Sequence, residues 1–187
     1  MNKKILLVYT GGTIGMVRTE SGYAPRAGYL ETFLRSIPAL QDPSMPQWDL
    51  LELSPLLDSS NMTVLDWNRI GGIIQEHYAA YDGFVILHGT DTMAYTASAL
   101  SFSLENLDKP VIITGSQIPL FEVRNDGLDN LLTSMVIAGE GRIHEGALCF
   151  DSKLMRGNRS TKISADAMEA FASPNYPVLA QAGVQLR

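Results

Sequence analysis

The sequence contains one cysteine, Cys149, among its 187 residues. A single cysteine cannot form an internal disulfide, and Cys149 sits between Leu148 and Phe150 in an apolar run typical of a strand. This context predicts a buried, unreactive thiol in a reducing compartment. We therefore expect a cytoplasmic protein.

Long apolar runs are also missing. Nowhere do about 18 consecutive apolar residues occur, and the short run 5–8 near the N-terminus has no small-residue cleavage site. The sequence therefore predicts neither a membrane-spanning segment nor an export signal.

Basic residues and histidines are scarce. The formal net charge is -6, with no basic cluster beyond the start "NKK", which argues against nucleic acid or an anionic membrane as the main partner. His77, His88 and His144 show no ligand spacing, so we predict no catalytic metal. Chemistry on a small molecule is the remaining expectation.

What the sequence does contain is an alternation of short apolar runs with longer helical patterns up to about residue 140. The clearest helix begins with Thr63 and Asp66 in capping-box spacing. Because parallel neighbours need crossover connections, this order predicts an open, mostly parallel α/β sheet flanked by helices, a Rossmann-like three-layer sandwich. The predicted strands are 3–10, 48–54, 83–89 and 110–115, and the predicted helices are 29–37, 63–81, 92–107 and 126–139.

The pattern changes after residue 140. Residues 146–151 and 153–157 are close enough to pair as a C-terminal hairpin, and the rest is irregular or weakly helical. The apolar tail "VLAQAGVQL" stops within a strand-like alternation. We expect that a further segment normally follows and that the tail packs on another surface, such as that of a dimer partner.

Small polar residues follow each predicted strand. In open parallel sheets ligands bind outside the carboxyl ends of the strands, and glycines there let the backbone approach a ligand closely. Four such loops on one edge predict a pocket for a polar small molecule. The loops are Thr10–Thr13, Asp58–Asn61, His88–Thr92 and Thr114–Gln117.

The glycine pair beside Thr13 helps to choose among the possible functions of these loops. Helix capping accounts for about half of the polar residues taken singly, but it does not explain two adjacent glycines. The stretch "TGGTIG" begins with Thr10 and so fails the dinucleotide fingerprint, and no Walker sequence occurs. Around Ser116, "GSQIP" lacks the Gly-x-Ser-x-Gly order of a hydrolase elbow.

A threonine nucleophile needs a base or a proton relay beside it. Thr90, Asp91 and Lys162 are candidates, because a carboxylate orients the ammonium while burial lowers the lysine pKa from about 10.4. Taken alone, the loop position of Lys162 favours a solvated surface charge. If the relay exists, Lys162 must lie within hydrogen-bonding reach of Thr90 or Asp91.

Three separated motifs, "TGGTIG", "HGTDTM" and "RGNRSTK", resemble the L-asparaginase family. The run 82–119 is similar to that of the cytoplasmic type I bacterial enzymes. The resemblance implies hydrolysis of L-asparagine to L-aspartate and ammonia without a metal or organic cofactor. It favours a nucleophile rather than a phosphate cradle at Thr13.

The resemblance also implies roles for individual residues. Thr13 corresponds to the primary nucleophile, and Thr90, Asp91 and Lys162 to a second catalytic group. Tyr23 corresponds to a tyrosine on a mobile loop over the site, and we expect residues 16–28 to be mobile. The implied substrate-binding residues are Gly12, Asp58, Ser59, Ser60, Gly89, Thr90, Asp91 and Gln117.

Ser59 and Ser60 fall where the family binds the substrate α-carboxylate, and Asp91 where it holds the α-amino group. A zwitterion needs hydrogen-bond donors for its carboxylate and an acidic group for its ammonium, which these loops supply. Type II enzymes have a glutamine in place of Ser60, so this chain departs from that branch.

By the same resemblance, 1–187 corresponds to an N-terminal domain, with the smaller C-terminal α/β domain of the family absent, and to a homo-oligomer, either a dimer or a tetramer. Two alternatives stay open: the glutaminase-type subunit of a transfer-RNA amidotransferase, and a non-catalytic amino-acid-binding module. The acidic charge and the absence of an extra N-terminal domain speak against the amidotransferase subunit. Ammonia release compared with calorimetric binding separates an enzyme from a binding module.

Overall fold

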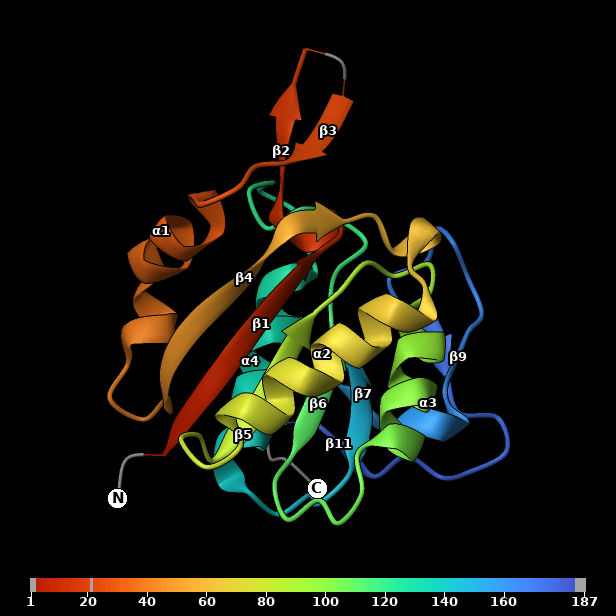
Figure 1. Cartoon of the computed structure of the whole chain (residues 1–187). Helices are drawn as coiled ribbons and strands as arrows, with labels where there is room; N and C mark the ends of the chain where they lie inside the picture. The colour runs from red at the N-terminus through yellow and green to blue at the C-terminus, as the bar shows by residue number, and fades with distance from the viewer. Residues whose placement is uncertain (1–2, 21, 184–187) are drawn as a thin grey trace.

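The computed structural model of the protein describes residues 3–20 and 22–183. Its centre is a seven-stranded sheet in the order β11-β8-β7-β6-β5-β1-β4 (Figure 1). In this sheet β4, β1, β5, β6 and β7 pair in parallel, β8 pairs antiparallel with β7, and β11 pairs antiparallel with β8. The strands are β1 Lys4–Gly11, β4 Gln47–Leu57, β5 Gly83–Leu87, β6 Val111–Thr114, β7 Gly146–Phe150, β8 Lys153–Arg156 and β11 Ala180–Gln181.

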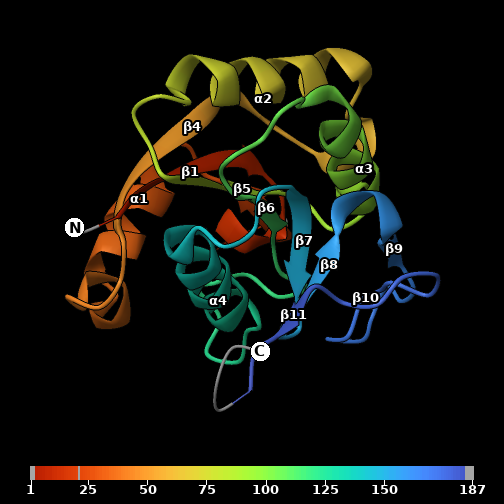
Figure 2. The same cartoon turned by 90° about the horizontal axis from the view of Figure 1, so that it is seen from below.

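Helices cover both faces of this sheet (Figure 2). On one face lie α2, Val64–His77, and α3, Met93–Ser103. On the other lie α1, Tyr29–Ser36, and α4, Gly127–Glu140. The predicted three-layer sandwich is confirmed.

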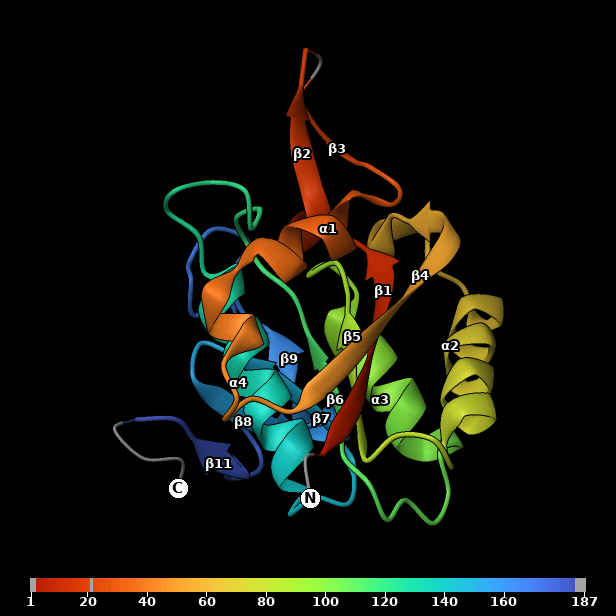
Figure 3. The same ribbon diagram turned by 90° about the vertical axis from the view of Figure 1, so that its left-hand side faces the viewer.

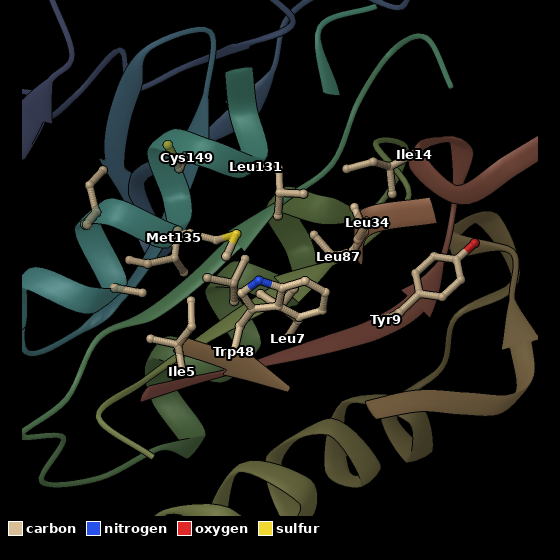
Figure 4. Close-up of a cluster of buried hydrophobic side chains, with 14 of the residues drawn as sticks. Ile5, Leu7, Tyr9, Ile14, Leu34, Trp48, Leu87, Leu131, Met135 and Cys149 are labelled. Carbon is tan, nitrogen blue, oxygen red and sulfur yellow. The ribbon is translucent and has the colours of Figure 1, made fainter. Parts of the chain in front are cut away.

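Alternation along β1 divides the core into two layers, because successive side chains of a strand point to opposite faces. Ile5, Leu7 and Tyr9 pack toward α1 and α4 (Figure 4). Leu6 and Val8 pack toward α2 and α3. Burial on both faces explains why the strands read as nearly continuous apolar runs.

Short strands and 3-10 turns lie outside the helices and the central sheet. The hairpin of β2, Met16–Thr19, and β3, Gly22–Pro25, projects beyond the carboxyl end of β1 (Figure 3). A two-residue ladder joins β9, Thr161–Lys162, to β10, Phe171–Ala172. The 3-10 turns are η1 Thr13–Gly15, η2 Pro38–Gln41, η3 Ser59–Asn61 and η4 Gly157–Arg159.

The predicted C-terminal hairpin is confirmed as β7 and β8, and Cys149 is fully buried, with its thiol pKa raised to about 11 by burial. Two expectations are wrong. The helix predicted for 92–107 ends at Ser103, because Leu104 adopts an extended backbone conformation, with a φ of -94° and a ψ of 97°. Part of the tail, Ala180–Gln181, pairs with β8 of its own chain rather than with another surface. The last four tail positions, 184–187, lie outside the described residues.

Across the described ranges, the helices are all too short or too polar to cross a lipid bilayer.

Candidate active site

Three loops meet at the carboxyl edge of the sheet, after β1, β4 and β5. A Cβ atom on Gly12 would lie 2.4 Å from the Cα atom of Gly89. A Cβ atom on Gly89 would in turn lie 2.4 Å from the Oγ atom of Ser59. Gly12 also has a φ of 86°, a conformation that other residues rarely adopt. Glycine at both positions is what allows the loops to touch.

Thr13 begins the turn η1 directly after this contact and is half-buried. Gly12 precedes Thr13 and Gly89 precedes Thr90, so the contact between the two glycines brings both threonines to the same edge. The buried Ile14 anchors the turn, and its carbonyl accepts a hydrogen bond of 3.1 Å from the Leu120 amide.

Lys162 crosses from β9 to the loop after β5. Its Nζ atom donates hydrogen bonds of 2.9 Å to Thr90 Oγ1 and 2.8 Å to Asp91 Oδ1. Thr90 is buried, with 7% of its surface exposed, whereas the side chain of Asp91 is 65% exposed. The predicted contact is confirmed, and the interpretation of Lys162 as a solvated surface charge is wrong.

Gln117 closes this group from the loop after β6. Its Oε1 atom accepts a hydrogen bond of 3.2 Å from Thr90 Oγ1, and its Nε2 atom donates to the Ala167 carbonyl at 3.1 Å. Asp126, which the sequence interpretation missed, holds the same loop, because its carboxylate accepts from the Gln117 and Ile118 amides. Its position in the sequence offered a signal, because an aspartate directly before the first residue of a helix is a preferred N-cap.

The loop after β4 is ordered by local capping. The Asp58 carboxylate accepts hydrogen bonds from the Ser60 amide and hydroxyl, at 2.9 and 2.8 Å. Ser59 is buried, and its carbonyl accepts a hydrogen bond of 2.7 Å from the Thr92 hydroxyl. Capping therefore explains Asp58, while Ser59 is tied to the loop that carries Thr90 and Ser60 stays at the surface.

Tyr23 lies apart from these residues. It is exposed on the β2–β3 hairpin, and its hydroxyl donates a hydrogen bond of 2.7 Å to Glu122 Oε1. This bond is the largest cause of a raised pKa for Tyr23. Among the described residues, no hydrogen bond joins Tyr23 to Thr13, Thr90 or Lys162. Its role over the site stays a prediction, as does the mobility of residues 16–28.

Hydrogen bonds join Trp67, Thr96 and His88 to the Gly89 carbonyl. The sequence did not predict this buried polar chain. His88 is fully buried, and its Nδ1 atom lies 2.7 Å from the Gly89 carbonyl, which can only accept. The proton therefore sits on Nδ1, and Nε2 accepts from the Thr96 hydroxyl at 2.8 Å. Trp67 Nε1 in turn donates to Thr96 at 2.9 Å. Burial lowers the pKa of His88 to about 4 and keeps the imidazole neutral.

The arrangement offers hydroxyl, amine and carboxylate groups at one sheet edge. Within residues 3–20 and 22–183, no three histidine, cysteine, aspartate or glutamate side chains gather as a metal-binding group. A hydroxyl 2.9 Å from an amine can exchange a proton with it directly. The side chains are those required for nucleophilic hydrolysis with proton transfer.

The fold and the site together define an open-sheet α/β protein with hydroxyl, amine and carboxylate groups gathered at the carboxyl edge of its sheet. The chain belongs to the asparaginase family, because the family model described as "Asparaginase, N-terminal" matches residues 4–187.

Three relatives are similar over nearly the whole chain. L-asparaginase 1 of Escherichia coli K12 is 57% identical over 185 residues, covering 99% of this chain and 55% of the relative. L-asparaginase of Dirofilaria immitis is 44% identical over 208 residues, covering 98% and 35%. The crystal structure of L-asparaginase I from Vibrio cholerae superposes with a TM-score of 0.93 at 51% identity, covering 100% and 56%.

The chain therefore spans about half the length, or less, of these relatives. All three are L-asparaginases by name, so the amidotransferase subunit and the binding module are not favoured.

Proposed function

We propose that this chain carries the amidohydrolase site that converts L-asparagine to L-aspartate and ammonia, with Thr13 as the nucleophile. The observation that carries the proposal is the contact of Lys162 with Thr90 and Asp91, next to the loop of Thr13. A lysine that is hydrogen-bonded to a carboxylate and to a buried hydroxyl can exchange a proton with that hydroxyl.

The reaction proceeds in two halves. The Thr13 hydroxyl oxygen attacks the side-chain amide carbon of asparagine, and its proton passes through Thr90 to the Nζ atom of Lys162. The tetrahedral intermediate collapses, the carbon–nitrogen bond breaks, and the nitrogen takes up a proton and leaves as ammonia. Water then attacks the aspartyl ester, which releases aspartate and restores the Thr13 hydroxyl. No cofactor is needed for this balance.

Recognition of the amino acid follows from charge. Asp91 is exposed enough to meet the substrate ammonium while one of its oxygens holds Lys162. In this proposal Ser59 and Ser60, on the neighbouring loop, donate hydrogen bonds to the α-carboxylate, and Gly12 and Gly89 allow the substrate to approach the backbone. Gln117 bridges Thr90 and the Ala167 carbonyl at the far side.

The same proposal covers the wider protein. We place this chain as the N-terminal domain of an enzyme whose smaller C-terminal domain adds to the site, acting as a cytoplasmic homo-oligomer. The buried, unpaired thiol of Cys149 fits a reducing compartment. The relatives' greater length supports the second domain.

Ammonia release from asparagine tests the function, with calorimetric binding measured in parallel. Thr13→Ala should still fold and bind asparagine but lose nearly all turnover, while the matched control Thr133→Ala, within α4, should keep it. With hydroxylamine present, wild-type protein should form aspartyl hydroxamate, because the acyl group passes through an ester. Turnover by Thr13→Ala equal to that of wild type would remove Thr13 from the mechanism. Binding without ammonia release by wild type would establish the binding module instead.

A further inference from the structure

The loop after β6 brings Gln117 to the side chain of Thr90, and we propose that Gln117 and Asp126 are positioning residues that set the direction of the Thr90 hydroxyl. Gln117 makes the contact with Thr90, and Asp126 acts through Gln117. The consequence for catalysis rests on the amidohydrolase function proposed above, whereas the direction of the hydroxyl follows from the hydrogen bonds alone.

The donor and the acceptor of each hydrogen bond at Thr90 are fixed by its partners. The Ala167 carbonyl can only accept, so the Nε2 atom of Gln117 donates to it at 3.1 Å and the Oε1 atom faces Thr90. Thr90 therefore donates its hydroxyl proton to Gln117, at 3.2 Å. Lys162 Nζ donates to Thr90 at 2.9 Å, so here the Thr90 oxygen is the acceptor.

These two contacts leave one lone pair on Thr90 Oγ1. A hydroxyl has one proton and two lone pairs, of which Gln117 takes the proton and Lys162 occupies one pair. The remaining pair can accept the proton that Thr13 gives up in the proposed reaction. Without the carbonyl of Gln117 the hydroxyl is free to rotate, and orientations that turn its proton toward Thr13 block this transfer.

Asp126 lies directly before α4, where an aspartate normally caps its own helix. Within the described chain its carboxylate forms no such cap, and Asn125 takes that role by accepting from the Leu128 amide at 3.1 Å. The Asp126 carboxylate accepts instead from the Gln117 amide at 2.9 Å and the Ile118 amide at 3.0 Å. Hydrogen bonds to a carboxylate are about twice as strong as neutral ones, so Asp126 fastens the loop rather than the helix.

Asn130, one turn into α4, completes the attachment of this loop. It is 3% exposed, and its Nδ2 atom donates to the Gly115 carbonyl at 3.0 Å and to Asp126 Oδ2 at 3.3 Å. A Cβ atom on Gly115 would lie 2.2 Å from the His88 carbonyl oxygen, so the loop lies directly against the end of β5. Helix α4 therefore fixes the backbone of the loop after β6 relative to the loop after β5.

Steady-state ammonia release by the full 187-residue chain tests the catalytic role. Gln117→Met keeps the length of the side chain but removes its carbonyl, and kcat should fall on the order of 100-fold while KM stays within about twofold of wild type. Asp126→Asn should lower kcat about tenfold, because its amine would face a backbone N–H. Asp129→Asn, at an exposed position on α4, is the matched control and should keep wild-type kcat.

The substrate-binding role that the resemblance implies for Gln117 predicts the opposite pattern. A raised KM with unchanged kcat in Gln117→Met would overturn the proposal. The double variant tests whether Asp126 acts through Gln117. Gln117→Met with Asp126→Asn should be no slower than Gln117→Met alone, because the second change has no further route to Thr90. Losses that multiply in the double variant would show that Asp126 acts independently and would overturn its assigned role.

An NMR measurement without substrate separates this proposal from the proposed function. The order parameter of the Thr90 methyl group should be high in wild type and Asp129→Asn, and lower in Gln117→Met and Asp126→Asn. This pattern in a chain that releases no ammonia would overturn the amidohydrolase function and support the positioning of Thr90. An equally ordered Thr90 in all four proteins would overturn the positioning role, whether or not asparagine is hydrolysed.

Discussion

Lys162 can serve the proposed reaction either as a fixed positive charge or as a proton acceptor. Both roles fit its hydrogen bonds of 2.9 Å to Thr90 and 2.8 Å to Asp91. Arginine separates the two roles, since a guanidinium keeps the charge but does not give up its proton. We expect Lys162→Arg to lose turnover by about 100-fold or more, the usual contribution of general acid–base catalysis, when ammonia release is measured.

The matched control for this loss is Lys153→Met. Lys153 forms its ion pair with Glu169 at the surface, and such pairs contribute little to stability. The control should keep wild-type turnover, and circular dichroism should show that both variants fold. Near-normal activity of Lys162→Arg would mean that Lys162 acts as a fixed charge and that the proton takes another route.

His88 should make the stability of the fold depend on pH. Its pKa is lowered from 6.5 to about 4 by burial, so the unfolded chain takes up a proton at a higher pH than the folded one. The stabilising effect of neutral His88 is therefore present above about pH 6.5 and is lost as the pH falls toward 4. We expect up to roughly 3 kcal/mol of unfolding free energy to be lost across this window in urea titrations.

His88→Asn removes the titrating group from this comparison. Its unfolding free energy should fall less steeply between pH 6.5 and 4 than that of wild type. Equal slopes in the two proteins, or nitrogen chemical shifts of a protonated His88 at pH 6, would show that the buried imidazole is not held neutral.

Elements whose pattern is local were predictable from the sequence. The strand from Lys4 and the helix after Thr63 follow from apolar periodicity and capping chemistry within a few residues. Lys162 is the opposite case. It reaches Thr90, 72 residues away, through the two-residue ladder of β9 and β10, which is too short to leave a periodic signal. The same holds for Tyr23, whose partner Glu122 is 99 residues away.

The start of α2 provides a measurable example of local chemistry. The Thr63 amide and hydroxyl both donate to Asp66 Oδ2 at 2.8 Å, and the Thr63 side chain accepts from the Asp66 amide, which completes a capping box. Thr63→Ala should cost about 1 kcal/mol of unfolding free energy in urea denaturation. Thr133→Ala, within α4, serves as the control and should change little. A loss well below 0.5 kcal/mol would mean that water replaces the cap at no cost.

The order of strands sets where the site forms. Parallel strands β1, β5 and β6 lie next to one another, so their carboxyl ends bring the loops of Thr13, Thr90 and Gln117 to one edge. This convergence was predictable from the strand and helix order alone. What covers the edge was not predictable in this way, because cover depends on contacts between segments that are distant in sequence.

The exposure of this edge leads to a prediction about catalysis. The Asp91 side chain is 65% exposed and Thr13 is half-buried, so water reaches the groups that hold charge in the proposed reaction. Excluding water strengthens such electrostatic interactions. We expect the 187-residue chain to unfold cooperatively but to hydrolyse asparagine at least about tenfold more slowly per site than a version extended to the length of its relatives. Ammonia release should be compared for the two lengths, each with its Thr13→Ala variant as background. Equal turnover per site at both lengths would show that this half supplies all the cover that the site needs.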